Sequence, residues 1–257
     1  MRLLPLQGDF VLLLPKERLA AVLRRLGMFV LMSKVTLSDA SAELRAIGLS
    51  GDCTAALPAA ETPAEADDSI EAQDGVTIVR LADAAPRYLL VGPGDAVAQR
   101  QQQLASIAPA ASEQQWWLLE IRAGLPTVFA ETAEAFVPQM LNMQSVNGVS
   151  FTKGCYTGQE VVARMQYLGK LKRRMFRVAI HGECPPAGAD LYSPQSSSGQ
   201  GGGKIVMSAP TAEGGCEALA VVEVANAGSG EVRVGDQNGA VVEFLQLPYA
   251  VEENSRE

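Results

Sequence analysis

The apolar and polar pattern near the N-terminus predicts a hairpin, a helix and a further strand. Two short apolar runs flank the turn-forming tripeptide Gln7-Gly8-Asp9, as in a β-hairpin. Pro15 suits the first turn of a helix, and apolar residues then recur at helical spacing until Gly27, which favours a stop. Residues 30–37 return to strand character.

Residues from about 42 to 107 mix strand and helix patterns. A short helix is expected after Gly51 and a longer one at the end of the region, an order typical of a split βαβ unit. Residues 58–74 are rich in Ala, Pro, Glu and Asp, which predicts a solvated loop. The strands are expected at residues 42–49, 76–81 and 88–91, and the longer helix at residues 95–107.

The remainder of the chain changes from helix to short strands. Ser112-x-x-Gln115 has capping-box form and opens a helix that Gly124 ends, and residues 149–153 are a short strand candidate. Past Lys170, glycine-punctuated β segments predict a small barrel or sandwich. These segments lie at residues 175–180, 204–207, 218–224, 231–234 and 240–245.

Composition narrows the classes of protein. Hydrophobic residues make up 47% and charged residues 19% of the 257, so the chain has the balance and length of a folded globular protein. The formal net charge of −8 argues against direct nucleic-acid binding, because phosphate binding needs clustered Lys and Arg. No stretch approaches the roughly 18 apolar residues of a membrane span, and no continuous apolar core of a signal peptide is present. We therefore expect a cytoplasmic protein without a membrane partner.

The cysteines are widely spaced. Cys53, Cys155, Cys184 and Cys216 include no CxxC pair, and His181 is the single histidine, so spacing indicates no zinc or iron–sulfur site. Few cysteines, with none needed as staples, fit a reducing cytosol. A cysteine hydrolase needs a base within reach of the thiol, and His181 is interpreted as a surface residue, so cysteine protease is a poor hypothesis.

The segment KGCYTGQE, residues 153–160, carries the strongest chemical signal. Thr157-x-x-Glu160 is a second capping box, which predicts a helix from Gly158 to about Leu168. Cys155 would then precede the free N–H groups and the positive end of the helix dipole.

The surroundings of Cys155 favour a reactive thiol. Gly154 and Gly158 flank it, and Lys153 adds a positive charge, which together with a helix N-terminus promotes the thiolate. The alternative is a small buried cysteine that fills a tight turn, since free cysteines are commonly buried.

Polar residues that follow the cysteine could contact a ligand. Gln159 and Glu160 could hydrogen-bond the edge of a heterocycle, although Glu160 could instead close its own cap. Arg164 is four residues beyond Glu160, so a surface ion pair is its alternative. A dense basic run is read as a solvated strand face, with an anionic ligand tail or RNA phosphate as the other interpretation. It consists of Lys170, Lys172, Arg173, Arg174 and Arg177.

KGCYTGQE, followed by VVAR and the basic stretch, resembles the signature of the YgfZ family, relatives of the tetrahydrofolate-dependent T-protein of the glycine cleavage system. Further segments resemble the same family: IRAGLP at Ile121 to Pro126, FVPQMLN at Phe136 to Asn142, and Leu247-Pro248-Tyr249.

The resemblance implies an α+β fold of T-protein type. Residues 1–170 would form a folate-binding body with ferredoxin-like βαβ elements and an inserted α+β subdomain at about residues 40–110, and residues 171–257 a C-terminal β-barrel. Met1 aligns with a strand well inside the family's first domain, so the opening part of that domain is expected to be missing.

The resemblance also implies a function. Members of the family are implicated in assembly or maintenance of iron–sulfur clusters, including those of tRNA-modifying enzymes, with binding of tetrahydrofolate or a derivative as a supporting property. Cys155 and Lys153 would carry the functional role. Folate contacts are expected among the other motif residues and one residue a turn further, namely Gly154, Tyr156, Gly158, Gln159, Glu160 and Arg164. An accessory factor is favoured; the alternatives are a tetrahydrofolate-dependent aminomethyl or one-carbon transferase, and an interaction protein in which the motif is only a structural corner.

Overall fold

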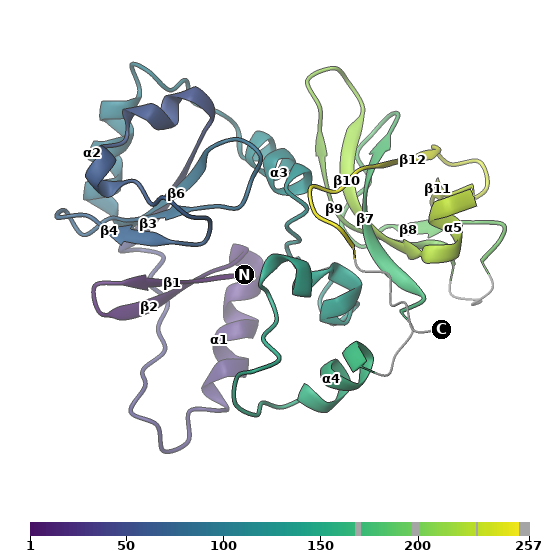
Figure 1. Cartoon of the computed structure of the whole chain (residues 1–257), viewed down its shortest axis with the longest axis horizontal. Coiled ribbons are helices and arrows are strands. Elements are labelled where there is room, and N and C mark those ends of the chain that lie inside the picture. The colour runs from purple at the N-terminus through teal and green to yellow at the C-terminus, as the bar shows by residue number, and fades with distance from the viewer. Residues whose placement is uncertain (168–170, 197–200, 230, 252–257) are drawn as a thin grey trace. The chain divides into compact units, whose positions relative to one another are not determined.

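The computed structural model describes residues 1–167, 171–196, 201–229 and 231–251. The chain forms two compact units, Met1–Ala111 and Ser112–Glu257, which we call the N-terminal and C-terminal units (Figure 1). The predicted end of the folate-binding body at residue 170 falls within the C-terminal unit and stays a prediction. Among the described residues, no helix has the length and apolar character that a membrane crossing needs.

The N-terminal unit begins with the predicted hairpin. Strands β1 (Arg2–Leu6) and β2 (Asp9–Leu13) pair in antiparallel register. Gln7 and Gly8 both adopt positive φ, at 52° and 85°, which is the conformation of a tight two-residue hairpin turn. The 3₁₀ turn η1 (Lys16–Arg18) and helix α1 (Leu19–Gly27) follow, so the predicted stop at Gly27 is confirmed.

The strand predicted at residues 30–37 is wrong. These residues form no regular element, and Leu31 and Met32 are 85% and 97% exposed. A strand needs hydrogen bonds from a neighbour, and the sheets of the described chain contain no strand from this segment.

An antiparallel sheet of order β3-β6-β5-β4 forms the centre of the N-terminal unit. The expected split βαβ unit, which requires a parallel pair, differs from this arrangement, because short connections join β4 to β5 and β5 to β6 as hairpins. Strand β4 also lies in the segment predicted to be a solvated loop. The elements are β3 (Leu44–Ser50), η2 (Gly51–Ala56), η3 (Ala59–Glu61), β4 (Ser69–Glu71), β5 (Thr77–Arg80), β6 (Arg87–Pro93) and α2 (Gly94–Leu104).

The core of this unit lies between the sheet and helix α2. Val76, Ile78, Leu90 and Val97 are each fully buried there. Helix α2 ends at Leu104, three residues before the predicted end at 107.

The C-terminal unit is built on a six-stranded antiparallel sheet of order β11-β8-β9-β10-β7-β12, which curves as a half-barrel (Figure 1). All five predicted β segments are confirmed. Strand β8 escaped prediction because it is only three residues long. The strands are β7 (Arg173–Ile180), β8 (Asp190–Tyr192), β9 (Gly203–Pro210), β10 (Cys216–Glu223), β11 (Arg233–Val234) and β12 (Val242–Leu245), and helix α5 (Val224–Ser229) follows β10.

Both faces of this sheet are covered. Helix α3 (Glu113–Arg122) begins with the predicted capping box, in which Ser112 and Gln115 exchange hydrogen bonds. Its Leu118 and Ile121 join one core cluster with Leu219 of β10, while the alternate residue Ala220 belongs to a second cluster on the opposite face. Apolar residues on both faces of a strand bury it completely, and the sheet is therefore the scaffold of the unit.

A disulfide joins Cys184 to Cys216, with the two Cα atoms 5.3 Å apart. The expectation that no cysteine acts as a staple is therefore wrong. The two residues are 32 positions apart in the sequence, and only the fold of the sheet brings them together. Cysteine usage consequently no longer argues for a reducing compartment.

Candidate functional site

The KGCYTGQE segment forms an exposed loop that leads into helix α4 (Gln159–Tyr167) of the C-terminal unit. The strand predicted at residues 149–153 is not formed. Ser150 Oγ instead accepts backbone N–H bonds from Thr152 at 3.4 Å and from Lys153 at 3.2 Å. Such local side-chain bonds satisfy the backbone in place of a strand partner.

Helix α4 begins at Gln159, one position later than predicted. Gly158 adopts a φ of +90°, a conformation open to glycine but strained for other residues. Gln159 Oε1 accepts the backbone N–H of Tyr156 at 3.2 Å, a bond one position before the predicted Thr157–Glu160 pair. Glu160 is exposed and therefore available to a ligand. The predicted helix end at Leu168 lies outside the described residues.

Cys155 is an exposed free cysteine, so the alternative of a buried, space-filling residue is wrong. The two residues of the motif around it pack on each other: Lys153 Nζ lies 4.6 Å from the centroid of the Tyr156 ring, a cation–π contact. Phe151 and Tyr167 make an edge-to-face contact at 6.1 Å, which joins the start of the loop to the end of α4. The predicted influence of Lys153 on the reactivity of the thiol stays a prediction.

The other predicted contact residues are presented to solvent. Arg164 and Glu160 are both exposed, and no ion pair between them occurs in the part of the chain that the structure describes. Gly154 is also exposed, and a Cβ atom placed there would meet no atom within 4 Å. His181 is an exposed residue whose Nε2 lies 3.1 Å from Oε1 of Glu243, as expected of a surface histidine.

Two buried amides hold the polypeptide on either side of the loop. Gln139 Nε2 donates to the backbone oxygen of Val162 in α4 at 2.6 Å, and Asn142 Nδ2 donates to the backbone oxygen of Met175 in β7 at 2.9 Å. Gln139 is 1% exposed and Asn142 is fully buried. Their segment, FVPQMLN, was noted in the sequence only for its resemblance to the family. The two amide side chains within this largely apolar segment were the signal that could have marked them as buried anchors.

The other segments that resemble the family have a structural contact of their own. Tyr249 Oη donates to the backbone oxygen of Gly124 at 2.8 Å, and a Cβ atom at Gly124 would lie 2.6 Å from the Tyr249 ring. Gly124 also has a φ of +67°. Both the close Tyr249 ring and this backbone conformation therefore favour glycine at this position. Burial raises the pKa of Tyr249 to about 12, which keeps its hydroxyl a donor.

Two arginines of the basic run pair with glutamates of β10. Arg177 Nη2 lies 2.7 Å from Glu217, which also accepts from Arg122 at 2.8 Å, and Arg173 pairs with Glu223 at 3.4 Å. Burial opposes ionisation of Glu217, but the two arginine hydrogen bonds outweigh it and lower the pKa of this carboxyl. Arg173 and Arg177 are thus partly buried and paired within the unit, which is neither the predicted solvated face nor a free phosphate site. Lys170 lies outside the described residues.

The chemistry available to the loop is that of a single thiol. Within the described ranges, no group of three or more His, Cys, Asp or Glu residues could hold a metal ion. An exposed thiolate can supply one sulfur ligand or form a mixed disulfide, and it needs a second molecule to do either.

The fold places the protein in the class of T-protein-like α+β proteins. The solved aminomethyltransferase T of the glycine cleavage system from Bartonella henselae superimposes with a TM-score of 0.54 at 16% identity, over 89% of this chain and 65% of that structure. No family model matches the sequence.

Curated relatives identify the family. The tRNA-modifying protein YgfZ of Colwellia psychrerythraea is 36% identical over 255 residues, which cover 97% of this chain and 77% of that protein. The proteins of the same name from Yersinia enterocolitica and Yersinia pestis are 32% and 33% identical, over 90% and 77% of this chain and 71% and 58% of their own lengths. The chain belongs to the YgfZ family, and the predicted resemblance is confirmed.

Proposed function

We propose that this protein is a folate-binding accessory factor that supports assembly or maintenance of iron–sulfur clusters, with tRNA-modifying enzymes among its clients and Cys155 as the key thiol. The observation that carries the proposal is the exposure of Cys155 on a loop whose flanks are held by buried side chains. Relatives at more than 30% identity bear the name tRNA-modifying protein, which supports the choice of client. The proposal includes a cytoplasmic location.

In this proposal the thiol acts on a partner and not as part of a hydrolase. Cys155 would offer its sulfur as a transient ligand to a cluster iron, or its thiolate would attack a disulfide of the client, forming a mixed disulfide and releasing the other client sulfur as a thiolate. Lys153 would add a positive charge for an anionic partner, and its packing on Tyr156 holds that charge near the loop. Lys153 and Tyr156 would thus shape the surroundings of the Cys155 thiol, and neither would act as a base.

The exposed residues at the start of α4 suit a reduced folate. Pterin recognition needs an acceptor for ring N–H groups, which Glu160 could supply, and the glutamate tail of a folate needs a cation, which Arg164 could supply. Tyr156, Gln159, Gly154 and Gly158 would complete the contacts. Residues 1–170 would form the folate-binding body, and residues 171–257 the barrel domain. Bound folate would bring the capacity for one-carbon chemistry.

A folate-dependent one-carbon transferase is the alternative. Its support is the likeness to aminomethyltransferase T, which at 16% identity shows the fold alone. A transferase would also need an acid or a base next to the transferred carbon. None of the motif residues has been assigned that role.

Two experiments test the proposal. In a strain that lacks its own family member, the wild-type chain should restore tRNA thiolation, and Lys153→Ala should restore it less well at equal protein level. Failure of the wild-type chain to restore thiolation would contradict the accessory role.

Folate binding is tested by titration with tetrahydrofolate under anaerobic conditions. Loss of a charged hydrogen-bond partner in Glu160→Gln should weaken binding by about tenfold. The exposed Glu183→Gln variant, outside the loop, is the matched control and should bind as the wild type does. Equal affinity of the two variants would remove Glu160 from the proposed site.

A further inference from the structure

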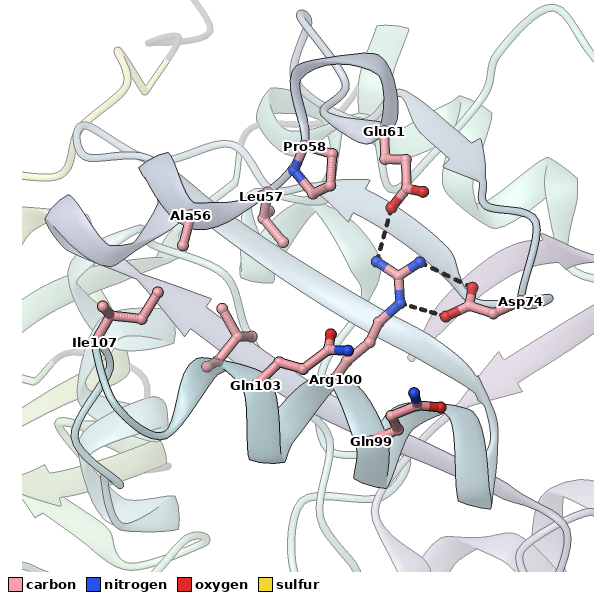
Figure 2. Close-up of a pocket in the computed structure, with 10 residues that line it drawn as sticks. Ala56, Leu57, Pro58, Glu61, Asp74, Gln99, Arg100, Gln103 and Ile107 are labelled. Carbon is pink, nitrogen blue, oxygen red and sulfur yellow. Dashed lines mark hydrogen bonds and ion pairs between the residues drawn. The ribbon is translucent and has the colours of Figure 1, made fainter.

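A hollow in the N-terminal unit is separate from the thiol loop in sequence and has a chemistry of its own. It lies between the segment that includes η3 and helix α2, and has a volume of about 370 Å³, within the range of small-ligand sites (Figure 2). Its lining consists of Ala56, Leu57, Pro58, Glu61, Asp74, Gln99, Arg100, Gln103, Leu104 and Ile107.

One end of the hollow carries a fixed group of charges. Arg100 donates from Nε and Nη2 to the two oxygens of Asp74, at 2.6 and 2.9 Å, and from Nη1 to Oε2 of Glu61 at 2.8 Å. Figure 2 shows the guanidinium between the two carboxylates. Its hydrogen bonds lower the pKa of Asp74, and the same bonds raise the pKa of Arg100 despite its partial burial, so both stay charged at neutral pH.

This group of charges has a negative excess. One guanidinium faces two carboxylates, and the other lining side chains are uncharged. Asp74 uses both oxygens on Arg100, whereas Glu61 uses one, and its Oε1 has no hydrogen bond to any described residue. The Glu61 side chain lines the hollow and is 26% exposed. The open acceptor therefore favours a cation over an anion.

The other end of the hollow is aliphatic. Leu57 and Leu104 line it together with Ile107, which is 55% exposed and lies at the far side from Arg100 (Figure 2). The amide of Gln103 lies between the aliphatic and the charged ends, and that of Gln99 lies on the far side of Arg100 (Figure 2). A bare metal ion would leave the apolar wall unused, while a ligand with an aliphatic stem would bury part of it.

We propose that this hollow binds a primary alkylammonium group, with the ammonium at Glu61 and the aliphatic stem against Leu57, Leu104 and Ile107. Three N–H donors of an ammonium can serve the free Glu61 oxygen and the side-chain oxygen of Gln103. Such a group occurs in a free alkylamine and in the side chain of a lysine on a peptide. The inference does not depend on the function proposed for Cys155.

The test is an NMR titration of the full chain with hexylammonium, at constant ionic strength, with hexanoate as the ligand of opposite charge. Hexylammonium should shift the methyl signals of Leu57, Leu104 and Ile107 saturably, and hexanoate should not. Glu61→Gln should weaken hexylammonium binding by about fivefold, as expected for loss of one partly exposed charge contact. Glu65→Gln, an exposed neighbour outside the lining, should leave binding unchanged.

A second variant separates ligand binding from folding. Ile107→Asn changes the aliphatic end without touching the Arg100 ion pairs and should also weaken hexylammonium binding, while thermal unfolding stays at the wild-type temperature. A parallel titration with Nα-acetyl-lysine methylamide distinguishes the two sources: tighter binding than hexylammonium assigns the hollow to a peptide lysine, and weaker binding assigns it to a free amine. Equal shifts with hexylammonium and hexanoate, or unchanged affinity in Glu61→Gln, would overturn the proposal.

Discussion

Strand β10 and helix α4 belong to the same unit and differ completely in burial. All eight residues of β10 are buried, whereas α4 has no buried residue. The strand is fixed by neighbours on both faces, and the helix that carries the thiol loop is held by a few specific contacts such as the Gln139 bond. Burial concentrates the packing of the unit in β10, and the proposed function assigns the chemistry to the exposed loop before α4, so substitutions should affect the two separately.

The largest effect is expected in the core. Leu219→Ala removes a fully buried side chain from β10 and should lower the free energy of unfolding by about 2–5 kcal/mol. Val161→Ala in α4, where the side chain is 58% exposed, should change it by less than about 0.5 kcal/mol. Urea unfolding measures both; similar losses in the two variants would contradict the contrast between strand and helix.

A smaller but clear effect is expected at Gly124. Gly124→Ala would force a Cβ atom against the Tyr249 ring in a backbone conformation with φ of +67°, and should cost about 1–3 kcal/mol. Gly154→Ala is the matched control, because a Cβ there meets nothing within 4 Å. Thermal unfolding compares the two; equal stability would show that the Tyr249 contact has no structural weight.

Loss of the Gln139 amide should act locally. Gln139→Ala leaves the Val162 oxygen without this donor and should ease the opening of α4 by about 1 kcal/mol, while β10 keeps its protection. Hydrogen exchange measured by peptide resolves the two elements. Gln114→Ala, at an exposed position of α3, serves as the control. Faster exchange in β10 as well would mean that Gln139 supports the whole unit and not the helix alone.

The smallest effect is a dependence on acid. The folded-state pKa of Glu217 is lower than its ordinary value of 4.5, because its bonds to Arg122 and Arg177 outweigh its burial. The stability this carboxylate provides is therefore complete above about pH 4.5 and is lost as the pH falls through the lower folded pKa. Glu217→Gln should thus be less stable than the wild type at neutral pH, and the difference should shrink in acid. Glu243→Gln is the control, because Glu243 belongs to an exposed pair. If this variant lost as much stability as Glu217→Gln, with the same pH dependence, the cluster of Glu217 with its two arginines would not be the source of the effect.

Local signals predicted the parts of the fold that local bonds determine. The Gln7-Gly8 turn and the Ser112 capping box need only their own neighbours, and glycines separate the five β segments in the sequence. The strand expected at residues 30–37 failed because a strand also needs a partner. The disulfide was not predicted, because Cys184 and Cys216 are brought together by the fold of the sheet and not by their local sequence.

The candidate site was also predicted only in part, because local signals are visible in the sequence and distant contacts are not. Cys155 and its glycines stand out by type and spacing, and the exposed position of the cysteine agrees with a functional interpretation. The start of α4 was predicted one position early, and the bond from the Tyr156 N–H to Gln159 was not foreseen. Gln139 and Asn142 were missed as anchors, because their partners are 23 and 33 positions away.

The most direct test of the central claim compares Cys155→Ala with Thr157→Ala, a second exposed residue of the same loop. The measurement is the amount of thiolated tRNA restored in a strain that lacks its own family member, at equal protein level and equal thermal stability. The account predicts loss of restoration in Cys155→Ala and full restoration in Thr157→Ala. Full restoration by Cys155→Ala would contradict the claim that the loop acts through its thiol.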